Sequence, residues 1–235
     1  MNKEAKNGTA GQYALTVIAR IHSDFKTKFG IPRQSGLIDA LTAEVVFEPE
    51  FRNADALRGI EGFSHLWLIW QFSAAAGRPW SPTVRPPRLG GNTRLGVFAT
   101  RSPFRPNPLG LSLVEIREIR LEGPQGPEIW VAGADLLDGT PIYDLKPYVP
   151  YADARPEARS GFAPAADAQL TVEDPQGLLE ALPQTQQEAL RGVLAQDPRP
   201  HYQKDPERVY GLRFDRWNVK FRVDGNTLWV EKLEE

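Results

Sequence analysis

The sequence predicts a mainly β protein that ends in a small α+β domain. Between residues 13 and 150, short runs rich in β-branched and aromatic residues are separated by glycine- and proline-rich turns, with no long helical period between them. This pattern favours a β-barrel or a β-sandwich over a doubly wound sheet. The chain has 235 residues, 41% of them hydrophobic, so it can bury a substantial core.

The predicted elements follow one another closely along the chain. Apolar residues take alternate positions at residues 13–21, which predicts the first strand. Residues 53–62 have the composition of a short helix that Gly62 would end. Further β-rich runs lie at residues 44–47, 65–72, 95–99, 111–119 and 129–134.

Beyond residue 150 the pattern changes. Residues 151–168 are rich in alanine and proline and lack periodicity, which indicates a linker or a strap running over the surface. Leucines at helical spacing follow in residues 176–195, where Pro183 should divide the helix into two pieces. Residues 217–223 and 227–233 read as a hairpin, with Asp224-Gly225 as a type I′ turn signal.

These elements define the expected domain organisation. We expect a flexible N-terminus at residues 1–12, a β domain at 13–150, a linker at 151–168 and an α+β domain at 169–235.

Composition excludes several classes of function. There is no cysteine, which excludes disulfides, thiolate zinc sites and cysteine nucleophiles. The three histidines are scattered and form no metal-binding pair, so we expect no metal. The polar N-terminus is unlike a signal peptide, and the longest apolar run, residues 63–72, is too short to span a bilayer. We therefore expect a cytoplasmic protein without a membrane partner.

One long segment has an unusual charge pattern. Residues 62–114, called the arginine segment below, contain six arginines and no aspartate or glutamate, although the whole chain has a net charge of −2. Guanidinium groups on stiff, proline-rich backbone are typical of a surface that binds phosphate or carboxylate. The alternative is an ordinary solvated loop, which usually carries both signs of charge. Gly90-Gly91 matches neither a P-loop nor a Rossmann fingerprint.

Three further groups of polar residues are candidates for a site. Asp135 and Asp138 follow the run at 129–134, and they could either make a turn or accept hydrogen bonds from a ligand ammonium or ribose. Arg33-Gln34-Ser35 is a polar group in a loop between predicted strands. Basic and aromatic residues alternate near the C-terminus, as on a nucleic-acid platform or an ordinary exposed face, and they include Tyr202, Lys204, Tyr210, Trp217 and Lys220.

Several motifs, taken in chain order, resemble the signature blocks of one family. They are Pro32-Arg-Gln-Ser-Gly, Gly62-Phe-Ser-His-Leu-Trp, Thr83-Val-Arg-Pro-Pro-Arg-Leu-Gly-Gly-Asn, Gly96-Val-Phe-Ala-Thr-Arg-Ser-Pro-Phe-Arg-Pro-Asn-Pro-Leu-Gly, Asp135-Leu-Leu-Asp-Gly-Thr-Pro, Asp144-Leu-Lys-Pro-Tyr and Ala195-Gln-Asp-Pro-Arg-Pro-His-Tyr. Together they resemble the TrmO-type (YaeB-like) tRNA methyltransferases over nearly the whole chain.

The resemblance implies a fold, a reaction and a set of partners. It implies a single-sheet β-barrel methyltransferase domain with a small C-terminal domain, acting as a homodimer. It also implies methylation of N6 of N6-threonylcarbamoyladenosine, next to the anticodon of tRNA, with S-adenosylmethionine as cofactor. When the cofactor contacts of the family are placed on the matching motifs of this sequence, the resemblance implies these cofactor-binding residues: Arg33, Gln34, Ser35, Phe72, Ser73, Arg101, Leu111, Asp135, Leu136, Leu137 and Asp138.

The reaction also needs a base and cationic partners. The target N6 carries a proton whose removal a general base would assist, and our candidates are Asp138, Asp144 and Tyr143. The candidates for contact with tRNA or with the threonyl carboxylate are Arg85, Arg88, Arg94, Arg105 and Lys220. The alternatives are a non-catalytic RNA-binding module and a methyltransferase that acts on another nucleobase or a small metabolite.

Overall fold

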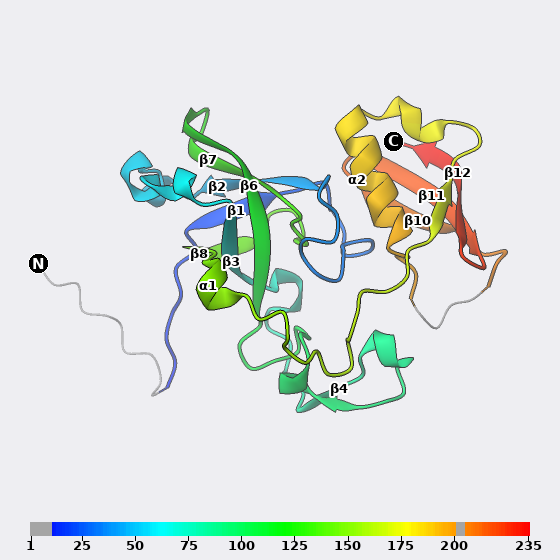
Figure 1. Ribbon diagram of the computed structural model, residues 1–235, viewed down its shortest axis with the longest axis horizontal. Helices are drawn as coiled ribbons and strands as arrows, with labels where there is room; N and C mark the ends of the chain where they lie inside the picture. The colour runs from blue at the N-terminus through cyan, green and yellow to red at the C-terminus, as the bar shows by residue number, and fades with distance from the viewer. Residues whose placement is uncertain (1–10, 201–204) are drawn as a thin grey trace, which may run out of the picture.

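The computed structural model describes residues 11–200 and 205–235 and has two packed units, a β-barrel and a C-terminal α+β unit (Figure 1). The barrel is closed in the order β1-β2-β7-β6-β3-β8. Its neighbouring strands are all antiparallel. The strands are β1 (Ala19–His22), β2 (Thr42–Phe47), β3 (His65–Gln71), β6 (Leu109–Gly123), β7 (Gly126–Ala132) and β8 (Pro141–Pro147). The expected mainly β, barrel-containing fold is therefore confirmed.

Side-chain alternation along the strands builds the barrel core. In β3, Leu66, Leu68 and Trp70 are buried while the residues between them are partly exposed. The register pairs Trp70 with Gly110 and Leu68 with Ser112 on β6. Because successive side chains of a strand point to opposite faces, these two β6 residues point inward with their partners.

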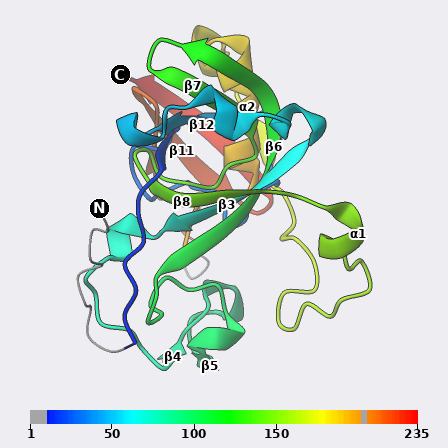
Figure 2. The same cartoon turned by 90° about the vertical axis from the view of Figure 1, so that its left-hand side faces the viewer.

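The arginine segment forms most of an irregular lobe at one end of the barrel. Between β3 and β6 the chain makes short 3-10 turns and one small hairpin, and Figure 2 shows this lobe on the opposite side from α2. Its elements are η4 (Ser73–Ala75), β4 (Thr83–Val84), η5 (Pro87–Leu89), β5 (Leu95–Gly96) and η6 (Val97–Ala99). Prolines limit regular hydrogen bonding here, which explains the absence of longer strands in this part of the chain.

The C-terminal unit is a four-stranded sheet with one long helix. The sheet order is β10-β11-β12-β9, and only the pairing of β12 with β9 is parallel. Leu190, Val193 and Leu194 of the helix α2 are buried in the core of this unit. Its elements are β9 (Thr171–Glu173), η7 (Leu178–Ala181), α2 (Gln184–Ala195), β10 (Tyr210–Phe214), β11 (Trp217–Asp224) and β12 (Thr227–Glu234).

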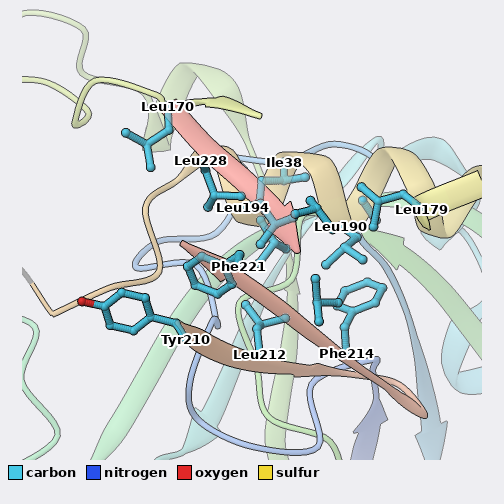
Figure 3. Packing of buried hydrophobic residues seen from close by; sticks show 14 of the residues in the cluster. Ile38, Leu170, Leu179, Leu190, Leu194, Tyr210, Leu212, Phe214, Phe221 and Leu228 are labelled. Atoms are coloured by element: carbon cyan, nitrogen blue, oxygen red, sulfur yellow. The ribbon is translucent and has the colours of Figure 1, made fainter. Parts of the chain in front are cut away.

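The connection between β1 and β2 belongs to both units. Phe25, Ile38 and Leu41 are buried in the C-terminal core, where the Phe25 ring meets the Phe214 ring edge-on with centroids 5.8 Å apart. Figure 3 shows Ile38 beside Leu190 and Leu194. An added Cβ at Gly192 would come within 2.6 Å of Ile38, so this contact requires glycine. The expected β domain at residues 13–150 therefore includes a segment whose buried side chains belong to the core of the C-terminal unit.

Several local predictions are wrong. The first strand covers Ala19–His22, while Tyr13 and Leu15 are exposed, because β2 and β8 pair only with residues from Ala19 onward. Residues 95–99 form two strand residues followed by a 3-10 turn. The predicted helix at 53–62 is two separate turns, η2 (Ala54–Leu57) and η3 (Ile60–Gly62), which follow η1 (Pro49–Phe51).

The C-terminal hairpin differs from the prediction by one residue. The hairpin exists and Asp224 pairs with Thr227, so the loop is Gly225-Asn226 instead of Asp224-Gly225. Among the described residues, Gly225 has φ 55° while Asn226 is not in the positive-φ region. A type I′ turn needs positive φ at both loop positions, so this turn is not of type I′. The division of the helical region at Pro183 is confirmed.

The linker contains little regular secondary structure. It begins with α1 (Pro150–Asp153), and residues 154–170 contain no helix or strand.

The predicted flexible N-terminus at 1–12 lies mostly outside the described residues, as do His201, Tyr202 and Lys204 of the C-terminal motifs. Among the described residues, no helix is both long enough and apolar enough to cross a membrane.

Candidate active site

A cavity of about 520 Å³ lies where the barrel meets the irregular lobe and the β1–β2 connection. A volume in this range suits a small-molecule ligand or cofactor. Nine of the candidate site residues line it, namely Arg33, Gln34, Phe72, Ser73, Arg101, Arg105, Leu111, Asp135 and Leu137. The wall also includes residues absent from our candidates, namely Lys28, Trp67, Trp70, Thr100, Pro103, Leu109, Gly110 and Thr140.

The apolar wall depends on one close approach between β3 and β6. An added Cβ at Gly110 would lie 2.2 Å from Cε2 of Trp70, which real atoms cannot do. The indole therefore lies directly against the backbone of β6, and the Phe72 ring packs near it with centroids 4.4 Å apart. Glycine in a strand often marks such an approach, so Gly110 was a usable signal in the sequence.

The polar part of the wall is a hydrogen-bonded chain from Trp70 to Asp135. Nε1 of Trp70 donates to Oγ of Ser112 at 2.9 Å, and that hydroxyl donates to Oδ1 of Asp135 at 2.6 Å. Ser112 is 1% exposed, so the middle of this chain is screened from water, while Asp135 is partly exposed at the cavity. Burial raises the pKa of the Asp135 carboxyl above its usual range, while the bond from Ser112 and the charge of Arg101 oppose the shift. Asp135 is the only acid among the described residues that line the cavity.

Cations face this carboxylate across the cavity. Arg101 donates from Nη1 to Oε1 of Gln34, which joins the irregular lobe to the β1–β2 connection. Lys28 donates to the carbonyl of Ala74 at 3.1 Å, and Arg33 forms an ion pair with Asp167 at 2.8 Å. The cavity therefore has an acidic wall at Asp135 and a basic rim, which suits a zwitterionic ligand.

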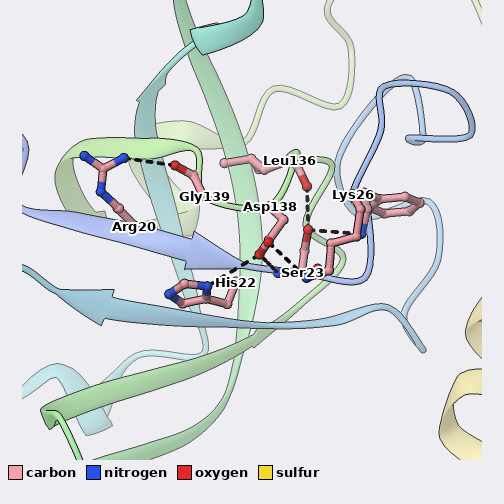
Figure 4. Close-up of polar contacts among 8 residues, drawn as sticks. Arg20, His22, Ser23, Lys26, Leu136, Asp138 and Gly139 are labelled. Carbon is pink, nitrogen blue, oxygen red and sulfur yellow. Dashed lines mark hydrogen bonds and ion pairs between the residues drawn. The ribbon is translucent and has the colours of Figure 1, made fainter. Parts of the chain in front are cut away.

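Asp138 has a different environment from Asp135, although the two are three residues apart. Oδ2 of Asp138 lies 2.9 Å from Nζ of Lys26, and Oδ1 accepts from the backbone N–H of Ser23 at 3.1 Å (Figure 4). His22 lies 3.4 Å from Oδ1. Partial burial pushes the pKa of Asp138 up, but the contacts with Lys26, Ser23 and His22 hold it below the usual range. Asp138 does not line the cavity, and it fastens the 135–140 turn to the end of β1.

The other two candidate bases also lie outside the cavity lining. Asp144 pairs with Lys146 at 2.9 Å and accepts from the backbone N–H of Leu145. The hydroxyl of Tyr143 donates to Oε1 of Gln71 at 2.6 Å. Asp144 has its partners on β8 and Tyr143 has its partner on β3, and none of the three candidate bases is among the residues that line the cavity.

Two residues expected to contact the cofactor have structural partners. Leu136 is fully buried in the barrel core. Oγ of Ser35 accepts from the backbone N–H of Leu113 at 3.1 Å, and Ser35 lines a second cavity, together with His65 and Glu115. Their side chains are therefore directed away from the main cavity.

The candidate RNA-binding cations are in varied positions. Arg85 is exposed, and Arg94 donates to Oγ1 of Thr83 at 3.1 Å. Arg105 donates to the carbonyls of Thr100 at 3.0 Å and Ser102 at 3.3 Å, so it stabilises the loop to which it belongs. Arg88 pairs with Asp167 at 2.9 Å. Lys220 lies on β11, in a different unit from the cavity-lining barrel residues.

Comparison with known proteins identifies the family. The model of the tRNA-methyltransferase O N-terminal domain matches residues 20–154, and that of the TrmO C-terminal domain matches residues 161–235. The chain belongs to the TrmO family. The tRNA (adenine(37)-N6)-methyltransferase of Escherichia coli K12 is 44% identical over 226 residues, which cover 92% of this chain and 96% of the relative.

Two Pseudomonas aeruginosa proteins extend the TrmO comparison. RcsF, provisionally named as an S-adenosylmethionine-dependent methyltransferase, is 46% identical over 88% of this chain and 90% of its own length. A crystal structure of TrmO from that organism matches with a TM-score of 0.77 and 36% identity, covering 97% of this chain and 99% of that one. The similarity therefore extends over both units of the fold.

Our sequence reasoning missed Trp70 and Ser112 as parts of the site. Ser112 is a polar residue at an inward position of a predicted strand, flanked by Leu111 and Leu113. Such a residue needs a buried partner, and that requirement was a signal available from the sequence. Its partner, Asp135, could be assigned only once β6 and the 135–140 turn were placed together.

Proposed function

We propose that this TrmO-family chain is an S-adenosylmethionine-dependent tRNA methyltransferase that acts on N6 of the adenine at position 37. We propose more specifically that the acceptor is N6-threonylcarbamoyladenosine. The observation that carries the proposal is the cavity with one partly buried acid, Asp135, facing a basic rim on a TrmO fold. The names of the relatives from Escherichia coli and Pseudomonas aeruginosa support the reaction and the cofactor.

The residues of the cavity fit the cofactor. S-adenosylmethionine supplies an electrophilic methyl group on a positively charged sulfur. Trp70, Leu109 and Leu111 offer an apolar wall to the nucleoside part, while Arg101 can bind the amino-acid carboxylate. Gln34, Phe72, Ser73 and Leu137 line the same space and complete the proposed contact set.

Asp135 is the general base in this proposal. Methyl transfer to nitrogen is an in-line displacement, so the protein must align the acceptor and assist the loss of its proton. Ser112 occupies Oδ1 of Asp135, which leaves Oδ2 to accept the N6 proton. The raised pKa makes this carboxylate a better proton acceptor than Asp138, whose pKa is lowered.

The same proposal assigns the RNA contacts and the assembly. Arg85, Arg94 and Arg105 of the arginine segment would bind the anticodon-loop backbone or the threonyl carboxylate, and Lys220 would extend the basic surface. The enzyme would act in the cytoplasm as a homodimer. Among the described residues, no group of three histidines, aspartates or glutamates could hold a metal ion, and the proposal involves none.

Nucleoside mass spectrometry tests the function. The purified protein is incubated with S-adenosylmethionine and tRNA that carries threonylcarbamoyladenosine, and the tRNA is then digested. We expect that nucleoside to gain the mass of one CH₂ unit. Methylation of unmodified tRNA at another base would replace our acceptor, and RNA binding without any methylation would indicate a non-catalytic binding module.

A further inference from the structure

The irregular linker contributes one acid to the rim of the site. Asp167 lies 2.8 Å from Nη1 of Arg33 and 2.9 Å from Nη2 of Arg88. Arg33 comes from the β1–β2 connection and lines the cavity, whereas Arg88 comes from the arginine segment and lies outside the lining. Two guanidinium groups from distant parts of the sequence therefore meet on one carboxylate. We call residues 154–170 the strap.

Between residues that the structure describes, the strap is held to the body of the protein by a small set of polar contacts. Backbone hydrogen bonds among its described residues are local, from Ala158 to Arg155 and from Ala163 to Ser160. Its C-terminal end is fixed where the N–H of Leu170 donates to the carbonyl of Ala195 at 2.8 Å. Between these points, Arg88 donates to the carbonyl of Ala165, and Asp167 makes the two ion pairs. Most strap residues are exposed, while Asp167 is partly buried.

The chemistry of this contact is that of an oxyanion site. Paired arginines are the usual partners of carboxylate and phosphate groups, which share planar or tetrahedral sets of oxygen acceptors. Arg33, Arg88 and Asp167 have side-chain exposures of 41%, 29% and 35%, so water screens the pairs. Ion pairs exposed to this extent contribute little to stability, so another oxyanion can replace the carboxylate.

The surroundings favour a phosphate of RNA over a small carboxylate ligand. Arg88 belongs to a segment in which Arg85 and Arg94 are exposed beyond the cavity rim. A row of cations leading away from a cavity suits a polymer with repeated charges, and a polyanion gains from counterion release at every contact. A single cofactor carboxylate would need only Arg101 of the cavity lining and would leave Arg88 unused.

We propose that Arg33 and Arg88 form a binding site for a backbone phosphate of RNA, which Asp167 of the strap fills until RNA displaces it. This inference rests on the proposed function for the choice of RNA as the ligand. Exchange of one single-charged oxyanion for another leaves the charge balance at the two arginines unchanged. The strap is then an intramolecular competitor, and its release accompanies RNA binding.

The test compares two neutralising substitutions in the strap. Asp167→Asn removes the competitor, and Glu157→Gln removes the same charge from an exposed position of the strap. Binding of an unmodified anticodon stem-loop oligoribonucleotide is measured without cofactor. We expect Asp167→Asn to tighten binding about three- to tenfold, as expected when a competing closed state is removed, and Glu157→Gln to change it less than twofold. Equal effects of the two variants would overturn the proposal, because general electrostatics would then explain both.

Two further measurements test whether Asp167 and Arg88 act at one site and whether that site binds RNA or the cofactor. Adding Arg88→Ala should abolish most of the gain from Asp167→Asn, and a full gain in the double variant would contradict a shared site. Affinity for S-adenosylmethionine alone should be unchanged in Asp167→Asn, and tightening of cofactor instead of RNA would overturn the choice of phosphate. Because these assays measure binding to unmodified RNA, failure of methyl transfer would reject the proposed function and leave this inference standing.

Limited proteolysis measures the release of the strap directly. Trypsin can cut the exposed Arg159–Ser160 bond within the strap. We expect faster cleavage there in Asp167→Asn than in the parent protein or in Glu157→Gln. Identical cleavage rates in all three proteins would show that Asp167 does not hold the strap, and would reject its role as competitor.

Discussion

The barrel end and the C-terminal unit of this TrmO-family protein use their residues in opposite ways. The C-terminal core is filled by side chains such as Leu190, Leu212 and Phe221, all fully buried, on regular strands and a helix. The barrel end instead has an irregular lobe, a cavity of about 520 Å³ and a carboxyl group with a raised pKa. The C-terminal core is therefore closely packed, whereas the barrel end retains a carboxyl group whose burial opposes stability.

The two regions are nevertheless mechanically connected. The β1–β2 connection packs Phe25 into the C-terminal core and a few residues later places Arg33 and Gln34 at the cavity. The backbone N–H of Asp215 donates to the carbonyl of Asp24 at 2.6 Å and reinforces this attachment. The well-packed unit thus serves as a support for one wall of the site.

The largest expected effect comes from the shared core. Phe214→Ala removes a fully buried ring that contacts Phe25, and it should lower the free energy of unfolding by about 3–5 kcal/mol. It should also weaken cofactor binding, because the Arg33 wall loses its support. Urea denaturation and calorimetric titration measure the two effects. Phe98→Ala is the control, since that ring is 73% exposed and its removal should leave unfolding nearly unchanged. Normal cofactor affinity in a destabilised Phe214→Ala protein would show that the regions are independent.

Asp135→Asn should lower the catalytic activity without lowering the stability of the fold. It retains an oxygen that can accept from Ser112 but loses the base, so kcat should fall by about 10²–10³-fold. Because the folded-state pKa of Asp135 is raised, its ionisation disfavours the folded state once the pH exceeds the unfolded-state value. At neutral pH the variant should therefore be as stable as the parent or slightly more stable.

The pH dependence of the same residue gives a second readout. In the parent protein, kcat should fall on the acid side as Asp135 becomes protonated, at a pH above the ordinary aspartate value of 3.8. That limb should disappear in the residual activity of Asp135→Asn. A change in the cofactor KM alone, with kcat intact, would assign Asp135 to cofactor binding instead of proton transfer.

Gly110→Ala should disturb the cavity wall. The new methyl group would collide with the Trp70 indole, and overpacking of this kind costs about 1–3 kcal/mol. We expect a raised KM for the cofactor in steady-state kinetics, because Trp70 must move within the wall. Gly96→Ala is the matched control, since that glycine has φ −59° and open space around its Cα. Equal behaviour of the two variants would show that the Trp70–Gly110 contact is unimportant for the site.

The smallest effect is expected from Asp138. Its folded-state pKa is lowered, so its ion pairs stabilise the fold above the ordinary value of 3.8 and this contribution is lost as the pH falls through the folded-state pKa. Asp138→Asn should cost less than about 1 kcal/mol at neutral pH, as partly exposed pairs do. In acid unfolding curves the cost should shrink as the pH falls below 3.8 and vanish only below the lower folded-state pKa. A large loss of kcat without a change in stability would restore Asp138 as a catalytic candidate.

The sequence by itself determined the elements whose pattern is local. The β-rich composition of residues 65–72 and 111–119 predicted the two strands that carry the cavity wall, and Pro183 predicted the division of the helical region. The absence of acids from residues 62–114 indicated the basic surface, and the signature blocks indicated the family. These properties depend on side-chain periodicity and composition, which neighbouring residues are enough to specify.

Only the tertiary structure distinguished the roles of residues of the same type. Asp135 and Asp138 differ because one meets Ser112 at the cavity and the other meets Lys26 at the end of β1. Arg88 has a partner 79 residues away in Asp167, and the β1–β2 connection packs on strands nearly 200 residues later. Burial, pairing and the resulting pKa shifts depend on which distant segments pack together, and no local pattern in the chain encodes that choice.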